Sequence, residues 1–155
     1  MKKGILAVSF GTSHIDTMEK TIDVLEKEFA KTFEEAVVYR AFTSNMIIKK
    51  LKRTANIKVQ TVGEALEKMA ADGIEEVIVQ PTHVINGIEN DRMLQEVMEH
   101  MHLFRKVYVG KPLLSSVEDY KKAIHAVMEK TVIGEDEMLV LMGHGTDHHA
   151  NSAYP

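Results

Sequence analysis

Runs of apolar residues alternate along this chain with stretches in which apolar and polar residues mix at helical spacing. Short apolar runs bounded by glycine, proline or polar residues are typical of buried strands. Five such runs predict strands over residues 4–10, 36–42, 75–83, 106–109 and 137–142. Proline cannot donate to a strand ladder, so the third strand is predicted to end near Pro81.

Between these runs, apolar side chains recur three and four residues apart, as they do on one face of an amphipathic helix. After Ser13 this spacing predicts one long helix whose inner face carries Ile15, Met18, Ile22, Leu25 and Phe29. A helix over about residues 90–104 is predicted to bury Met93, Leu94, Val97, Met98 and Met101. A last helix is predicted to bury Val117, Tyr120, Ile124 and Val127.

Polar residues that stabilise helix ends mark where several of the helices begin. Ser44 and Ser116 precede helical stretches, and Thr61 with Glu64 forms a capping-box pattern. Gly73 follows the helix that Thr61 opens and predicts its end.

The order of the predicted elements determines the fold class. Strands that alternate with helices form βα units with right-handed crossovers, so we predict an α/β fold: a parallel sheet flanked by helices on both faces. A similar strand–turn–helix signature occurs twice, at residues 10–14 (FGTSH) and 144–148 (HGTDH), which suggests a duplicated unit. We therefore predict one α/β domain over residues 1–134, with residues 135–155 forming the first strand and helix start of a second half.

Composition and charge narrow the classes of partner. The chain has 155 residues and a formal net charge of −4, which offers no basic footprint for nucleic acid or an anionic membrane. It contains no cysteine, so a transition-metal site must use His, Asp or Glu. No apolar stretch reaches the length of a membrane span, and the N-terminal run lacks a signal-peptide cleavage pattern. We expect a cytoplasmic protein.

Nucleotide-binding signatures are missing from the sequence. No G-x-G-x-x-G follows a predicted strand, and there is no Walker A lysine motif. We therefore expect no nucleotide and no organic cofactor.

Two histidines follow predicted strands. His144 comes after the run 137–142, and His83 comes after Pro81. Parallel strands end at one edge of a sheet, where α/β proteins bind ligands, and a neutral imidazole there binds divalent metals or accepts a proton. Glu89, at a predicted helix start, offers a carboxylate ligand or a proton relay. The alternative is structural: histidines bonded to nearby backbone and a glutamate stabilised by the helix dipole.

Several other polar residues have two interpretations. His148 and His149 either extend a metal site or lie on a solvated helix face. Arg40, Lys49 and the basic residues that follow form either a solvated face or a site for a polyanionic small molecule. The helix N-termini predicted after Gly11 and Gly145 offer backbone N–H groups to carboxylates.

Six segments resemble, in the same order, the sirohydrochlorin cobaltochelatases of anaerobic cobalamin synthesis, which are the longer class II chelatases. They are residues 8–13 (VSFGTS), 40–51 (RAFTSNMIIKKL), 83–87 (HVING), 111–116 (KPLLSS), 142–145 (MGHG) and 148–150 (HHA). The resemblance runs over the whole chain, and the segment 40–51 and the region 142–150 are the most specific.

The resemblance implies an ATP-independent insertion of Co²⁺, as substrate metal, into sirohydrochlorin. It implies two similar α/β halves with the tetrapyrrole in the cleft between them. His144, in the Gly-His-Gly tip, is expected to ligate the metal and to accept a proton from a pyrrole nitrogen, and His83 and Glu89 are expected to add metal contacts. We predict substrate contacts from Phe10, Gly11, Thr12, Ser13, Arg40, Lys49 and Gly145.

The resemblance also leaves alternatives open. The family continues into a second half that supplies a further Glu and His to the metal, so this chain is expected to be either a fragment or one copy in a homo-oligomer. Imidazole and carboxylate ligands accept several divalent metals, so a class II chelatase for iron or nickel is an alternative. Others are a non-catalytic tetrapyrrole- or metal-binding module and a plain α/β domain without metal.

Overall fold

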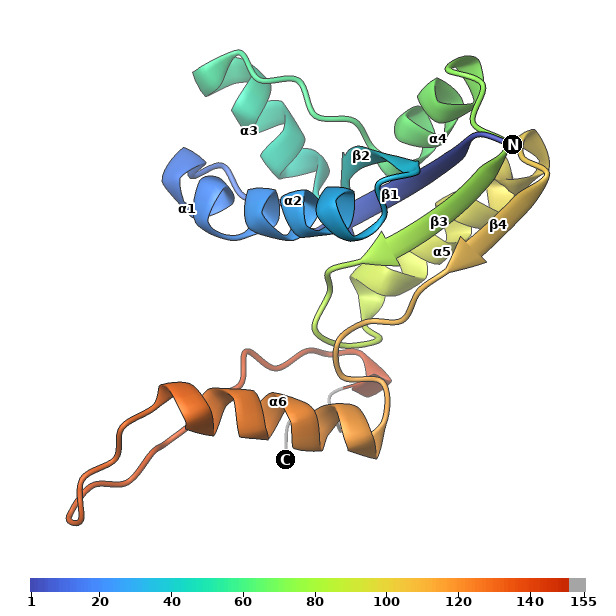
Figure 1. Cartoon of the computed structure of the whole chain (residues 1–155). Helices are drawn as coiled ribbons and strands as arrows, with labels where there is room; N and C mark the ends of the chain where they lie inside the picture. Colours follow the sequence, from blue (N-terminus) through green and yellow to red (C-terminus); the bar gives the residue numbers. More distant parts are fainter. Residues whose placement is uncertain (151–155) are drawn as a thin grey trace.

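The computed structural model describes residues 1–150, and Figure 1 shows the path of the chain. The strands are β1 (Lys3–Ser9), β2 (Ala36–Phe42), β3 (Glu76–Pro81) and β4 (Lys106–Val109). The helices are α1 (Ile15–Lys20), α2 (Ile22–Thr32), α3 (Asn45–Ala55), α4 (Val62–Ala71), α5 (Ile88–His100) and α6 (Val117–Lys130), with a 3₁₀ turn at Met101–Leu103. Within residues 1–150, we find no helix with the length and apolar character needed to cross a membrane.

The strands of the described part form one parallel sheet in the order β2-β1-β3-β4. Leu6 of β1 is paired with Tyr39 of β2 on one side and with Val79 of β3 on the other. The chain thus leaves β1 toward one edge and later returns to its other side, so the topological switch point lies between β1 and β3. The predicted parallel α/β sheet is confirmed, and the carboxyl ends of these strands lie at one edge.

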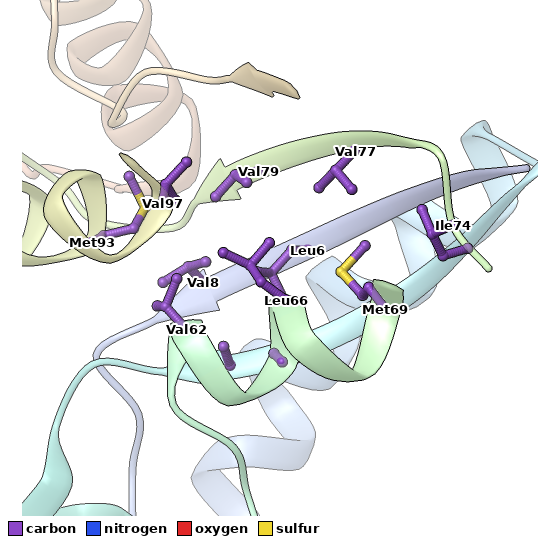
Figure 2. Close-up of a cluster of buried hydrophobic side chains, with 12 residues drawn as sticks. Leu6, Val8, Val62, Leu66, Met69, Ile74, Val77, Val79, Met93 and Val97 are labelled. Carbon is purple, nitrogen blue, oxygen red and sulfur yellow. The ribbon is translucent and has the colours of Figure 1, made fainter. Parts of the chain in front are cut away.

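Helices cover both faces of the central strands. Leu6 and Val8 of β1 point toward α4 and α5, and the alternate residues Ile5 and Ala7 are buried on the opposite face. Figure 2 shows the larger core, in which side chains of α4 and α5 pack over β1 and β3. Its buried members are Leu6, Val8, Ala41, Val62, Ala65, Leu66, Met69, Ile74, Val77, Val79, Met93 and Val97.

A second, smaller core fixes the end of β2. Phe42, the last residue of β2, is fully buried together with Leu51 of α3. The other buried members of this core are Met18, Ile22 and Val59.

Three predicted helix caps are confirmed. The Ser44 hydroxyl accepts a hydrogen bond from the backbone N–H of Ile47 at 3.3 Å, and Thr61 and Glu64 form the reciprocal capping box. The Ser116 hydroxyl accepts one from the backbone N–H of Asp119 at 3.2 Å. These bonds satisfy N–H groups that have no partner within the helix.

The single long helix predicted after Ser13 is wrong, because the structure breaks it at Thr21. Thr21 has φ −127° and ψ −78°, which separates α1 from α2, and its hydroxyl donates to the carbonyl of Thr17 at 2.6 Å. Threonine competes in this way for backbone groups and disfavours a regular helix. The break turns part of the predicted inner face outward, so that Leu25 is exposed.

The strand predicted over residues 137–142 is also wrong. These residues form no strand, and Met138, Val140, Leu141 and Met142 are 69–96% exposed. An apolar run becomes a strand only when a neighbouring strand accepts its hydrogen bonds, and no described strand pairs with this run.

Helix α6 forms where the pattern predicts it but lies apart from the sheet (Figure 1). None of its residues is buried, and the stripe of Val117, Ile124 and Val127 is exposed rather than packed. Met98 and Met101, predicted to point inward from the preceding helix, are exposed as well.

Candidate functional site

An open pocket of about 640 Å³ lies at the carboxyl edge of the sheet, beside the switch point between β1 and β3. Its walls come from residues 9–11 at the end of β1 and in the turn after it, from Ile22 of α2, from most of residues 82–92 after β3, and from residues 144–146. Small-molecule sites commonly enclose roughly 300–1,000 Å³, so the pocket has room for a ligand of that class.

Backbone hydrogen bonds hold the loops that form the pocket. The N–H of Thr82 donates to the carbonyl of Val8 at 2.8 Å, and the N–H of Thr43 donates to the carbonyl of Ser9 at 2.9 Å. The hydroxyls of Ser9 and Thr82 are 2.7 Å apart and share a hydrogen bond. The pocket floor is therefore attached to the rigid sheet.

Gly11 permits the tight turn at the pocket wall. Its φ is +102°, and a Cβ there would lie 2.5 Å from the buried ring of Phe42.

We expect Gly11→Ala to lower the free energy of unfolding by about 2–5 kcal/mol, the sum of backbone strain and overpacking. Urea unfolding tests this, with Gly73→Ala as control: Gly73 has φ +79° and open space around it. The control is expected to cost only about 1–2 kcal/mol of strain. Equal costs in the two variants would contradict the packing argument.

His83 lies two residues past the end of β3, as predicted, and lines the pocket. Both ring nitrogens are buried without a hydrogen-bond partner. Burial lowers the pKa of His83 below its ordinary value of 6.5, and the nearby Glu89 carboxylate partly opposes this shift. The imidazole is therefore neutral at pH 7 and keeps a lone pair for a metal ion or a proton.

Glu89 lies in the first turn of α5 and also lines the pocket. Its Oε1 accepts a hydrogen bond from Arg92 Nη1 at 2.8 Å, whereas Oε2 is buried and has no partner. Arg92 thus orients the carboxylate and leaves one oxygen available. Asn90, also part of the pocket wall, has a buried Oδ1 without a partner.

His144 reaches the same pocket from a loop rather than from the tip of a strand. Its Nδ1 is 2.9 Å from the carbonyl oxygen of Gly145, which can only accept, so Nδ1 carries the proton. Nε2 then has a free lone pair on an exposed ring. His83 and His144 therefore lie at the same edge of the sheet, as the metal hypothesis requires.

The unpartnered polar atoms concentrate in this pocket. Of the five buried side-chain N or O atoms without a partner in residues 1–150, four belong to His83, Glu89 and Asn90. Such atoms are costly unless a ligand, ion or water satisfies them, so they mark the pocket as the candidate binding site. Among residues 1–150, no three His, Asp or Glu side chains stand close enough together to hold a metal ion, so His83, Glu89 and His144 do not form a three-ligand set here.

The predicted substrate contacts fall into two groups. Phe10, Gly11 and Gly145 line the pocket, and Thr12 and Ser13 follow in the same turn without lining it. Arg40 and Lys49 do not line it.

The guanidinium of Arg40 is held by carboxylates of α2, Asp23 and Glu26. These pairs raise the pKa of Arg40, with the hydrogen bond to Glu26 as the main cause. Lys49 is exposed on α3. The substrate-binding roles of both residues stay predictions.

Arg92 and Asn90 were missed by the sequence analysis. An i, i+3 pair of Glu89 and Arg92 in a helical first turn was a visible signal for Arg92, although such pairs are common on solvated helices. Asn90 had no sequence signal, because its burial depends on tertiary packing.

Comparison with known proteins gives concordant results. Residues 3–155 match a family model described as cobalt chelatase (CbiK). The chain is 43% identical over 155 residues to the sirohydrochlorin cobaltochelatase of Salmonella typhimurium, covering 99% of this chain and 59% of that protein. It is 34% identical over 157 residues to sirohydrochlorin cobaltochelatase CbiKC of Nitratidesulfovibrio vulgaris, covering 99% of this chain and 55% of that protein. The chain thus spans somewhat more than half the length of these relatives.

A solved structure supports the fold independently. A Marinobacter aquaeolei VT8 protein, named for CbiX of cobalamin (vitamin B12) biosynthesis, superposes with a TM-score of 0.53 at 15% identity. The match covers 83% of this chain and 95% of that one.

Proposed function

This chain belongs to the cobalt chelatase (CbiK) family, and on that premise we propose that it inserts Co²⁺ into sirohydrochlorin, a reaction of cobalamin biosynthesis. The proposal rests on one observation. The buried ring nitrogens of His83 and the buried Oε2 of Glu89 have no hydrogen-bond partner, and both residues line the same pocket as His144. Co²⁺ is a substrate here, and the reaction needs no nucleotide.

The chemistry of insertion matches these side chains. The macrocycle exchanges two pyrrolic N–H protons for one Co²⁺, so two protons must leave and the metal must lose water. The free Nε2 of His144 binds the incoming ion or accepts one of the protons, since imidazole does both near neutral pH. His83 and the free oxygen of Glu89 supply the other protein contacts to the metal.

An open metal site suits a reaction in which the ion must be released to the product. A complete set of protein ligands would retain the metal, as structural sites do. The described residues offer an incomplete set, which leaves coordination positions for water and then for the pyrrole nitrogens. Imidazole and carboxylate ligands also accept Fe²⁺ and Ni²⁺, so metal choice is decided by assay.

The pocket wall has two features that suit a planar, polycarboxylate macrocycle. Phe10, Val84 and Ile88 present exposed apolar side chains to the pocket. Arg92 and the N-terminus of α5 place positive charge at its rim. The macrocycle face is proposed to contact the apolar wall while its carboxylates approach the rim.

We expect Arg92→Ala to weaken sirohydrochlorin binding about tenfold, because it removes a charge-assisted contact and frees the Glu89 carboxylate. The dissociation constant is measured from the absorbance of the macrocycle, without metal, at low and high salt. The loss is expected to shrink at high salt. Lys49→Ala is the matched comparison. An equal loss of affinity in Lys49→Ala would show that the carboxylates of the macrocycle bind at α3 and not at the pocket.

We also propose that residues 135–155 belong to a second unit and that two copies of the chain associate. The stripe of Val117, Ile124 and Val127 on α6 and the apolar run 138–142 each expose several large apolar side chains, more than single scattered residues would. Light scattering after size exclusion is expected to give the mass of a dimer. Replacing Ile124 and Leu141 with Asp is expected to give a monomer. A monomeric wild type would contradict the association.

The direct test of the function is an anaerobic assay of cobalt insertion into sirohydrochlorin, followed by absorbance. We expect insertion faster than in a protein-free control. Parallel runs with Fe²⁺ and Ni²⁺ decide the metal. Macrocycle binding without accelerated insertion would assign a binding role instead of catalysis.

A further inference from the structure

His144 is held over the pocket by a segment that has little packing of its own. The preceding apolar residues, Met138 to Met142, form no strand and are largely exposed. His144 itself is exposed, and its Nδ1 bonds locally, to the carbonyl of Gly145. Its position must therefore be fixed by contacts elsewhere in the segment.

His148 makes such a contact. Its Nε2 lies 2.9 Å from Asp91 Oδ2, which links this segment to α5 across 57 residues of sequence. The His148 side chain is only 13% exposed, and its ring packs against that of His149 with centroids 3.8 Å apart. Its backbone N–H also donates to the Thr146 hydroxyl at 3.2 Å, which ties it to the residues that follow His144.

The tautomer of His148 follows from its two partners. The backbone N–H of Ala150 points at Nδ1 at 3.1 Å, so Nδ1 accepts and carries no proton. Nε2 therefore carries the proton and donates a hydrogen bond to the Asp91 carboxylate. The contact is a directed hydrogen bond of a neutral ring, which constrains orientation as well as distance.

Asp91 lies on the same helical turn as Glu89. Residues two apart on a helix do not share a face, so Glu89 can line the pocket while Asp91 reaches the segment of His144. A single turn of α5 thus carries Glu89, a proposed metal contact, and bonds to the segment that carries His144, the other proposed contact.

We propose that Asp91 is a positioning residue that, through His148, fixes His144 opposite Glu89. The inference rests on the proposed function, because it assumes that His144 contacts the metal. Residues that orient a metal ligand typically contribute a factor of about 10–100 to affinity.

The test is a double-mutant cycle read by the affinity for Co²⁺ alone, measured from its ligand-field absorbance. We expect Asp91→Ala to weaken Co²⁺ binding about tenfold in the wild-type background and not at all in the His144→Ala background. Asp91→Asn keeps an oxygen that accepts from His148 and is expected to retain affinity within about twofold. Glu99→Ala, an exposed carboxylate near the other end of α5, is the control and is expected to match the wild type.

The outcomes separate the inference from the proposed function. If Asp91→Ala binds Co²⁺ as the wild type does while His144→Ala does not, the positioning role is overturned and the proposed function stands. An equal loss in both backgrounds, or in Asp91→Asn, would assign Asp91 a general structural or charge effect and also overturn it. If His144→Ala itself binds Co²⁺ normally, the metal role of His144 fails and the positioning role falls with it.

Discussion

His144→Ala is expected to lose cobalt insertion, with a rate at least about 100-fold below that of the wild type. The substitution removes the exposed Nε2 that binds the ion or accepts a pyrrole proton. The free energy of unfolding is expected to change by less than about 0.5 kcal/mol, because the ring is exposed and its Nδ1 bonds to the adjacent carbonyl of Gly145. Absorbance-monitored insertion and urea unfolding measure the two quantities on the same preparation.

His125→Ala provides the matched control for this prediction. His125 is exposed on α6, 3.2 Å from Glu129, and lies outside the pocket wall. Its loss is expected to leave insertion unchanged. If His144→Ala retained insertion but unfolded more easily, the residue would have a structural role and would not be the metal ligand or proton acceptor.

His83→Leu is expected to bind Co²⁺ at least tenfold more weakly while becoming more stable than the wild type. Leucine has a volume close to that of histidine and lacks the two buried nitrogens that have no partner. Removing such atoms should raise the free energy of unfolding by about 1–3 kcal/mol. A residue that costs stability and carries metal binding has the signature of a functional position.

The stability that His83→Leu gains over the wild type depends on pH, and its direction follows from the lowered pKa of His83. Because burial lowers the pKa of His83, the unfolded chain binds a proton below pH 6.5 that the folded chain refuses. The wild type therefore loses stability as the pH falls from 6.5 toward the folded-state pKa, and His83→Leu lacks that loss. The stability difference between the two should grow as the pH is lowered in urea unfolding experiments.

His100→Leu is the counterpart for this experiment. The ring of His100 is also largely buried, but its Nδ1 bonds to the carbonyl of Glu96 at 2.8 Å. Leucine there breaks a satisfied contact, so the variant is expected to be less stable than the wild type. Destabilisation of His83→Leu to the same degree would mean that His83 is a satisfied core residue and not part of a metal site.

The sheet and the location of the pocket could be predicted from sequence because both depend on local patterns. Apolar runs at 36–42 and 106–109 coincide with β2 and β4, and alternation with helices determines a parallel sheet. A parallel sheet brings all its carboxyl ends together. The sequence position of His83, just after Pro81, was therefore enough to place it at the ligand-binding edge.

The remaining features depend on tertiary context that a local pattern does not contain. The run 137–142 has strand composition, yet it has no partner strand in the described chain. The break at Thr21 comes from a hydroxyl–carbonyl contact within a stretch of helical periodicity. Arg40 has the charge that a carboxylate site needs, but Asp23 and Glu26 from α2 already pair with it.

We propose that the pocket at the carboxyl edge of β1 and β3 takes Co²⁺ on imidazole and carboxylate ligands. X-ray absorption at the cobalt edge, on Co²⁺ bound to this chain, reads these ligands from the metal itself. We expect scattering from imidazole rings together with oxygen ligands, with a weaker imidazole signal in His83→Leu and in His144→Ala. A shell of oxygen ligands alone, or a spectrum unchanged in both variants, would contradict it.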